Sequence, residues 1–152
     1  MEECSLDALI KLLDENLEYV SHEIIEDTIY INIKSNKKEA CCSDCNTPSE
    51  RIHSRYTRSF QDLPISGKKT VLILNNRKFF CDNEDCNRKT FAEKFDFIEP
   101  KAKKTKRLET EIINLSKNMS SISASKLLEK NVATVSKSTV CNIFKKRNTN
   151  TR

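Results

Sequence analysis

Two cysteine pairs constrain the fold of this chain more than any other feature of its sequence. The first pair is Cys42-x2-Cys45 and the second is Cys81-x4-Cys86, with 35 residues between them. Four thiolates at these spacings can bind one zinc ion tetrahedrally, because each tight loop presents two sulfur atoms to the same side of the metal. A bound metal also stabilises a module whose apolar core is thin. The spacing therefore predicts a zinc-stabilised module that spans both pairs, with Zn2+ as its cofactor.

The choice of ligands leaves two alternatives open. Cys41 directly precedes Cys42, and we favour Cys42 because the x2 spacing to Cys45 gives the tighter chelate. His53 lies between the two pairs and is a conceivable replacement ligand, although a surface or hydrogen-bonded structural role is the simpler interpretation. The alternative for the four paired cysteines as a set is that they are free thiols in a core.

The seven cysteines of this 152-residue chain do not indicate a secreted, disulfide-linked protein. Their number is odd, and no charged-then-apolar leader opens the sequence, so metal binding in a reducing compartment is the better interpretation. Cys4 and Cys141 have no partner at metal-binding spacing, and Cys141 fits a small apolar side chain in a helix. No run of about 18 apolar residues occurs, and a single glycine excludes Gly-rich nucleotide-binding loops. We therefore expect a soluble, cytoplasmic protein that has no contact with membranes.

Short strands are expected around the cysteine pairs. Tyr19–Ile25 and Thr28–Lys34 form a predicted hairpin around the Glu26-Asp27 turn, since the second segment alternates apolar and polar residues. Lys69–Asn75 and Arg77–Cys81 are two further strand candidates, and the second leads into the second cysteine loop. These segments together predict a small β-rich metal module.

Helical spacing of apolar residues occurs in one segment near the N-terminus and in three segments of the last third. Ser5–Leu17 forms a predicted helix with Ser5 as its N-cap, and Thr105–Asn118 and Ile122–Lys130 form two more. Ser136–Arg147 begins at a Ser N-cap, after a short turn at Asn131–Val135. The apolar residues expected on the buried sides are Leu6, Leu9, Ile10, Leu13, Leu17, Leu108, Ile112, Leu115, Met119, Ala124, Leu127, Leu128, Val140, Ile143 and Phe144.

Charge is distributed unevenly along the chain. Residues 1–40 carry 4 basic and 10 acidic side chains, for a net charge of −6, and residues 41–100 carry 10 and 9, for a net charge of +1. Residues 101–152 carry 13 basic and 3 acidic side chains, for a net charge of +10. Such a basic segment is typical of a surface that binds a polyanion, with a solvated lysine-rich face as the alternative.

Two short helices joined by a tight turn fit a helix-turn-helix, in which Ser136–Arg147 is the recognition helix. With its apolar side against the core, hydroxyl and amide groups on the other side can contact base edges, and lysines can contact phosphates. The basic stretch Lys101–Arg107 can add backbone or minor-groove contacts. A three-helix bundle for protein contacts is the alternative. The predicted DNA-binding residues are Lys101, Lys103, Lys104, Lys106, Arg107, Lys137, Ser138, Thr139, Asn142, Lys145 and Lys146.

The predicted fold class is α+β, with a small zinc-ribbon-like β-module followed by a three-helix helix-turn-helix domain. The N-terminal helix and β-hairpin occupy residues 1–35, and the four-cysteine zinc-binding β-module occupies residues 36–98. A basic linker follows at 99–104, the helix-turn-helix at 105–147 and a frayed tail at 148–152.

The order of these features resembles the N-terminal half of the insertion-sequence transposases of the ISL-three group. The resemblance covers roughly residues 30–147, and its most specific part is Cys81-x4-Cys86 followed by Arg88 and Phe91. Other matching residues are Asp62-Leu63-Pro64 and Ser136–Val140. The resemblance implies that Cys42, Cys45, Cys81 and Cys86 are zinc ligands and that the last helix recognises DNA. One departure is Ser120-Ser121, where relatives often have glycines.

The family also implies a target and an activity. Its members bind the terminal inverted repeats of bacterial insertion elements and continue into an Asp-Asp-Glu catalytic domain. Catalysis needs carboxylates that hold two divalent metals, and residues 101–152 contain only Glu109, Glu111 and Glu129. We therefore expect a truncated, non-catalytic, nucleoid-associated fragment that binds double-stranded DNA, and a homodimer or an association with a full-length transposase stays open. The alternatives are a transcription regulator and a zinc-stabilised protein-interaction adaptor.

Overall fold

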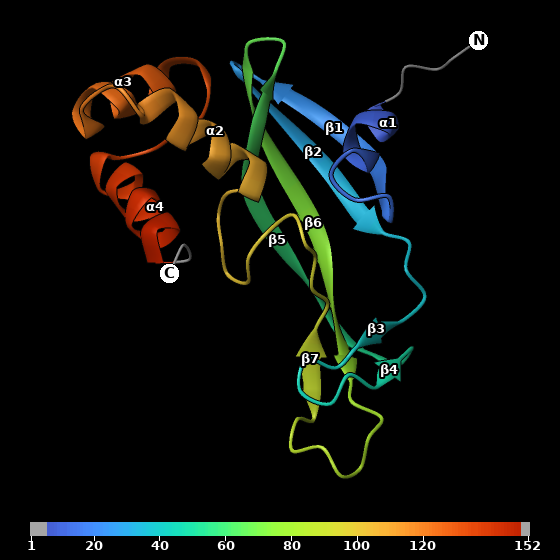
Figure 1. Cartoon of the computed structure of the whole chain (residues 1–152). Helices are drawn as coiled ribbons and strands as arrows, with labels where there is room; N and C mark the ends of the chain where they lie inside the picture. Colours follow the sequence, from blue (N-terminus) through green and yellow to red (C-terminus); the bar gives the residue numbers. More distant parts are fainter. Residues whose placement is uncertain (1–5, 150–152) are drawn as a thin grey trace.

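The structure, a computed structural model, describes residues 6–149 and has a mixed α+β architecture (Figure 1). Its strands are β1 (Leu17–Ile25), β2 (Thr28–Ser35), β3 (Ala40–Cys41), β4 (Pro48–Ser49), β5 (Ile52–Ile65), β6 (Lys68–Phe80) and β7 (Thr90–Ala92). Its helices are α1 (Leu6–Lys11), α2 (Lys106–Ser116), α3 (Ser121–Asn131) and α4 (Lys137–Thr149). Within the described residues, none of the helices combines the length and apolar character needed to span a bilayer.

A long antiparallel ribbon of β5 and β6 connects the other parts of the molecule. The main sheet has the order β1-β2-β6-β5, in which β2 runs parallel to β6 and the other neighbours are antiparallel. Helices α2–α4 lie at one end of the ribbon, whereas β3, β4 and β7 lie at its other end (Figure 1). The cysteine loops and the C-terminal helices therefore occupy opposite ends of the same two strands.

The hairpin predicted before the first cysteine pair is present, but the strands after it differ from the prediction. β1 and β2 pair around Glu26, which has a left-handed φ of 53°. The prediction of two strands at Lys69–Asn75 and Arg77–Cys81 is wrong, because β6 continues through Asn76 without a break. Asn76 is 1% exposed, and its amide donates a hydrogen bond of 2.6 Å to the Tyr56 hydroxyl on the partner strand. That cross-strand bond pairs the amide nitrogen of a residue type that is common in turns, whereas the amide oxygen of Asn76 is buried without a hydrogen-bond partner in the described contacts.

The predicted N-terminal helix is also shorter than expected. It ends at Lys11 instead of Leu17, and its predicted N-cap, Ser5, lies outside the described residues. The Asp14 carboxylate accepts a hydrogen bond of 2.9 Å from the backbone N–H of Asn16, a local turn that competes with the helix. Leu17 then begins β1 and is fully buried in the sheet core. The helical spacing of apolar residues in this segment thus does not reflect one continuous helix, because its first residues belong to α1 and its last residue, Leu17, begins β1.

One face of the sheet carries the larger apolar core. The alternating residues Ile29, Ile31 and Ile33 of β2 are buried there, as the period-2 pattern predicted. Leu72 and Leu74 of β6 lie on the same face. Residues from α1, β5 and the segment after β7 complete this core, namely Ile10, Phe60, Phe95, Phe97 and Ile98.

The three C-terminal helices have an apolar core of their own. Its buried members include Leu108, Ile112, Leu128 and Val140, all of which were expected on buried sides. Two other expected members are exposed instead, since Met119 is 38% exposed and Leu127 is 47% exposed. Each helix begins at a hydroxyl N-cap whose side-chain oxygen accepts a backbone N–H bond two or three residues on. The caps are Thr105, Ser120 and Ser136.

The segment predicted as a basic linker runs alongside β5. The backbone N–H of Gln61 donates to the carbonyl of Lys103 at 2.8 Å, and the N–H of Thr105 donates to the carbonyl of Gln61 at 3.0 Å. Arg58 donates to the carbonyl of Glu99 at 2.6 Å. Because backbone bonds hold this segment on an edge strand, the three helices are attached to the sheet rather than tethered by a free chain.

Candidate metal centre and nucleic-acid interface

Two tight backbone loops present the paired cysteines. In the first, between β3 and β4, the N–H of Cys42 donates to the carbonyl of Thr47 at 3.0 Å, and Asn46 has a left-handed φ of 59°. In the second, between β6 and β7, the N–H of Cys81 donates to the carbonyl of Lys89 at 2.9 Å. The N–H of Cys86 donates to the carbonyl of Asn83 at 3.1 Å. Each loop reverses the chain so sharply that its two sulfur atoms point to one side.

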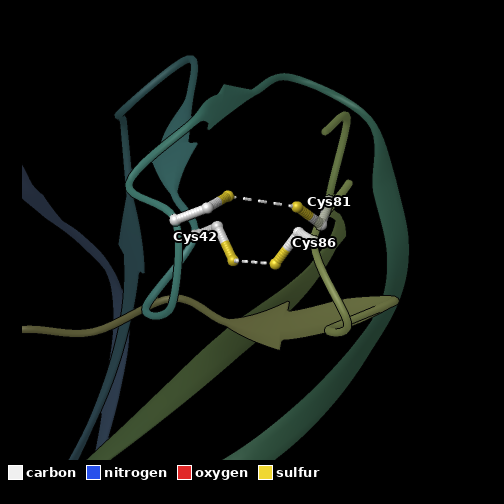
Figure 2. A group of neighbouring side chains, drawn as sticks. Cys42, Cys81 and Cys86 are labelled. Atoms are coloured by element: carbon white, nitrogen blue, oxygen red, sulfur yellow. Dashed lines mark hydrogen bonds between the residues drawn. The ribbon is translucent and has the colours of Figure 1, made fainter. Parts of the chain in front are cut away.

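The four sulfur atoms of Cys42, Cys45, Cys81 and Cys86 lie within 4.8 Å of one another. Across the two loops, the Cys42–Cys86 distance is 4.0 Å and the Cys45–Cys81 distance is 3.5 Å (Figure 2). A tetrahedral zinc ion with Zn–S bonds of about 2.3 Å requires sulfur atoms about 3.8 Å apart. The separations therefore fit a zinc ion without rearrangement of either loop. Four protein sulfurs complete a tetrahedral coordination sphere, which is typical of structural rather than catalytic zinc.

The acid–base chemistry of these thiols also fits a divalent cation. Hydrogen bonds with Thr47 lower the pKa of the Cys45 thiol to about 6. At Cys81, a backbone hydrogen bond with Asn83 lowers the pKa, but burial and the neighbouring cysteine thiols outweigh it and raise the pKa to about 12. Four thiols at such short distances cannot all ionise by themselves, because their negative charges repel. A bound metal ion removes this conflict, since it stabilises every thiolate that it coordinates.

A small apolar cluster packs against the four cysteines of the metal centre. Phe79 of β6 and Phe91 of β7 are buried, and their rings stack with centroids 5.8 Å apart. Beside them, Arg77 forms an ion pair with Glu93 at 2.8 Å, and both side chains are less than 10% exposed. The Ser35 hydroxyl donates a hydrogen bond of 2.7 Å to the same carboxylate. This paired and hydrogen-bonded network connects β2, β6 and the segment after β7 next to the cysteine loops.

Two surface ion pairs also connect the chain around the first cysteine loop with the chain around the second. Arg88, two residues after Cys86, lies 2.9 Å from Asp44 in the first loop. Arg51, just after β4, lies 2.6 Å from Asp82 in the second loop. These pairs are exposed, and exposed pairs contribute little to stability, so they orient the loops more than they hold them together.

The structure decides between the candidate ligands that the sequence left open. Cys41 is exposed and lies outside the group of four sulfur atoms, whereas Cys42 is 2% exposed and lies within it. His53 is exposed and also lies outside the group. Its ring contacts Phe80 at 4.9 Å, and its Nδ1 lies 2.9 Å from the Ser54 hydroxyl. Cys141 is half-buried on α4, far from the cysteine loops in the sequence, and Cys4 lies outside the described residues.

The predicted base-contacting residues lie on α4. Lys137, Ser138, Asn142 and Lys145 are exposed, whereas Val140 and Ile143 on the opposite side are buried. Thr139 is half-buried, and its hydroxyl lies 2.9 Å from the hydroxyl of the N-cap residue Ser136.

The predicted phosphate-contacting residues are less uniform. Lys101 and Lys103 are exposed, but Lys104 is half-buried, and this burial lowers its pKa. Arg107 forms a two-nitrogen ion pair with the buried carboxylate of Asp62. Two other lysines pair with acidic groups of the same region, Lys106 with Glu99 at 3.2 Å and Lys146 with Glu109 at 3.9 Å.

Sequence reasoning missed the residues that join the parts of the molecule. Asp62 is 2% exposed and accepts hydrogen bonds from Thr105 at 2.8 Å and from Arg107, so it anchors the start of α2 to β5. Arg77 and Glu93 pair in the same way beside the metal centre. No local pattern marks these residues, because their partners lie 16 to 45 residues away. A charged residue inside an apolar run, as at Arg77, is the one available signal.

Comparison with known proteins supports the interpretation of the cysteine module. Residues 38–86 match a family model described as the zinc-finger of transposase IS204/IS1001/IS1096/IS1165, and this range contains all four clustered cysteines. No curated protein and no solved structure matches the chain. Residues 38–86 are therefore a transposase-type zinc ribbon, and zinc is the metal for which its four cysteines are arranged.

Proposed function

We propose that this chain is a zinc-dependent DNA-binding protein that recognises the terminal inverted repeats of an insertion element. The observation that carries the proposal is the transposase-type zinc ribbon with its four convergent sulfur atoms. In this proposal Cys42, Cys45, Cys81 and Cys86 are the zinc ligands. The described residues serve DNA binding, and strand cleavage is the task of a separate catalytic domain in proteins of this kind.

The metal would act on DNA binding through the fold. Zinc binding joins the β3–β4 loop to the end of β6, and β6 continues without interruption to the helical end of the molecule. Structural zinc contributes directly to the folding free energy of small modules. Removal of zinc should therefore disorder the zinc end of the ribbon and the small cluster around Phe79 and Phe91.

The helix α4 is the proposed recognition helix. It carries exposed lysines at both ends and exposed Ser138 and Asn142 between them, while Val140 and Ile143 anchor it in the helical core. An amide side chain on a helix in the major groove can bind adenine with two hydrogen bonds. The exposed lysines would contact phosphates on either side, as expected for a segment with a net charge of +10 over residues 101–152.

Equilibrium binding to a labelled inverted-repeat duplex, measured with and without a chelator, tests this proposal. We expect affinity to fall steeply as salt rises, because each neutralised phosphate contributes about 0.9 to the slope of log affinity against log salt. We also expect chelation to weaken binding and zinc addition to restore it. Salt-independent or absent binding by the folded, zinc-loaded chain would contradict the proposal and favour a protein-interaction role. Preference for an operator duplex over element ends would favour a transcription regulator.

A further inference from the structure

The edge strand β1 has one side without a partner. It pairs with β2 on one side, and no other described strand pairs with its second side (Figure 1). At the level of Glu23, the opposite edge of the sheet is closed, because the backbone of Gln61 in β5 bonds to Lys103 and Thr105. A free edge presents unpaired backbone N–H and carbonyl groups to any segment that can add a strand. Within the described residues, β1 therefore carries the open edge of this part of the sheet.

Large apolar side chains are exposed along this edge. Val20, Ile24 and Ile25 are 53%, 54% and 49% exposed. Strand register places Ile24 beside Ile29 of β2, which is only 7% exposed and belongs to the sheet core. Ile24 thus lies on the core face of the sheet, at the point where the cover of that core ends. An added strand with an apolar side chain opposite Ile24 would extend the same core and remove apolar surface from water.

The other face of the edge is acidic. Glu23 precedes Ile24 directly, so its side chain points to the opposite face, beside Tyr30 of β2. The surrounding sequence has the same character, since residues 12–33 contain six acidic side chains and no Lys or Arg. The six acidic residues are Asp14, Glu15, Glu18, Glu23, Glu26 and Asp27.

Cations from neighbouring segments neutralise only part of this charge. Lys34 of β2 pairs with Glu18 at 3.4 Å. The Lys68 amine donates to the backbone carbonyl of Glu26 at 3.2 Å. None of the described ion pairs engages Glu23, which is exposed. A basic side chain opposite Glu23 would therefore meet a carboxylate that has no cationic partner of its own.

The helical part of the molecule leaves the edge accessible. The turn before α4, at 132–134, reaches Thr28 and Tyr30 of β2, with which it lines a small pocket. Ser21–Ile25 of β1 are all exposed beside it. A bulge between Tyr19 and Ser21 interrupts the regular strand geometry. The part of the edge that can accept a regular strand is therefore the five residues Ser21–Ile25.

The charge of the edge discriminates between possible occupants. Nucleic acid is disfavoured, because phosphates and carboxylates repel each other. A second copy of β1 is also disfavoured, because it would place one acidic strand against another, and like charges across neighbouring strands are destabilising. A strand of alternating basic and apolar residues suits both faces, since its successive side chains would point to the acidic face and to the core face in turn.

We propose that the β1 edge at Ser21–Ile25 binds a partner protein through an extended segment of alternating basic and apolar residues, which adds a strand to the sheet. Backbone hydrogen bonds to the free edge supply affinity, and the contacts with Glu23 and Ile24 select the pattern of side chains. This inference goes beyond the proposed function, because the partner is a protein and the surface does not include α4.

Fluorescence anisotropy with the full, zinc-loaded chain tests this surface. The probe is a labelled peptide of about seven residues that alternates lysine and valine, long enough to span the free edge. We expect it to bind and to shift the backbone amide signals of Ser21–Ile25 in a two-dimensional NMR spectrum. Glu23→Lys and Ile24→Lys should each weaken binding several-fold. The matched controls are Glu129→Lys and Ile122→Lys, which change exposed residues of α3 and should leave binding unchanged.

A peptide that alternates lysine and proline has the same charge but lacks a backbone N–H at every second position, so it should bind several-fold more weakly. Equal affinity for the two peptides, or unchanged affinity in both Glu23→Lys and Ile24→Lys, would overturn the inference. A dimer of the chain alone that Ile24→Lys dissociates would also overturn it, because a second copy would then occupy the edge. Zinc content of each variant checks its folding. Failure to bind DNA would overturn the proposed function and leave this inference standing.

Discussion

Cys41 and Cys42 are neighbours in the sequence, yet only the sulfur of Cys42 lies with those of Cys45, Cys81 and Cys86. Cys41 is the last residue of β3, and successive side chains of a strand point to opposite sides. The alternation that exposes Cys41 therefore directs Cys42 into the cluster with Phe79 and Phe91. The tighter x2 chelate and the direction of the side chain thus favour the same cysteine.

The ligand assignment predicts the result of single cysteine substitutions. The wild-type chain should contain about one zinc ion bound by four sulfur atoms. Cys42→Ser, Cys45→Ser, Cys81→Ser or Cys86→Ser should each lower the zinc content and destabilise the ribbon end, because three thiolates bind zinc less tightly than four. Metal analysis and thermal unfolding measure both effects. Cys41→Ser and Cys141→Ser are the controls and should change neither quantity.

Two results would contradict this assignment. Full zinc occupancy in a Cys81→Ser, Cys86→Ser double variant would remove the second loop from the metal site. Loss of zinc in Cys41→Ser, with normal zinc in Cys42→Ser, would show that the adjacent cysteine is the ligand.

At the level of elements, α4 combines a helix cap with the proposed base contacts. The Ser136 oxygen accepts the backbone N–H of Thr139 at 3.2 Å, and the two hydroxyls lie 2.9 Å apart. The Thr139 side chain is therefore engaged in the cap of the helix. Asn142 and Ser138, by contrast, are exposed and have no such structural role in the described contacts. We therefore propose Asn142, rather than Thr139, as the residue whose side chain would contact a base.

Substitutions in α4 should therefore separate stability from specificity. Asn142→Ala should cost about 1–3 kcal/mol of binding free energy on the specific duplex and little on random DNA. Ser136→Ala should instead lower the free energy of unfolding by about 1 kcal/mol, because it removes an N-cap. Binding titrations on the two duplexes and denaturant unfolding measure these effects. Equal losses on both duplexes for Asn142→Ala would argue against a base contact by this residue.

At the level of the whole molecule, Asp62 is the junction between the sheet and the three helices. Its buried carboxylate accepts bonds from the N-cap residue Thr105 and from Arg107, at the start of α2. Leu63, next to it, packs against the helical core. Loss of one partner from a buried, hydrogen-bonded ion pair leaves the other groups unsatisfied, which is costly in free energy.

Asp62→Ala should consequently loosen the helices without disturbing the metal centre. We expect a loss of about 2 kcal/mol in the free energy of unfolding, since Arg107 retains partial access to solvent. Helical circular dichroism should melt at a lower temperature, while zinc content stays at the wild-type value. Asp96→Ala, which removes an exposed carboxylate, is the matched control. Simultaneous loss of zinc in Asp62→Ala would show that the two ends of the ribbon do not fold independently of this junction.

Local patterns in the sequence were sufficient for much of this protein. Cysteine spacing predicted the metal and its type, because chelation by tight loops is a local property. Apolar spacing predicted α2, α3 and α4 to within a few residues, with Ser136 as the N-cap of α4, and period-2 alternation predicted the β1–β2 hairpin. These features depend on residues that are close together in the chain, so each can be recognised in the sequence.

The tertiary structure alone decided how these parts are joined. β5, with its many polar residues, shows no clear alternation, and it became a strand of 14 residues because β6 supplied its hydrogen bonds. Asn76 stayed within β6 because the Tyr56 hydroxyl accepted a hydrogen bond from its amide nitrogen, and Arg107 gained a buried ion-pair partner because Asp62 lay across the junction. Such outcomes depend on partners 20 to 45 residues away, and no local pattern encodes a contact whose free energy arises only when distant segments meet.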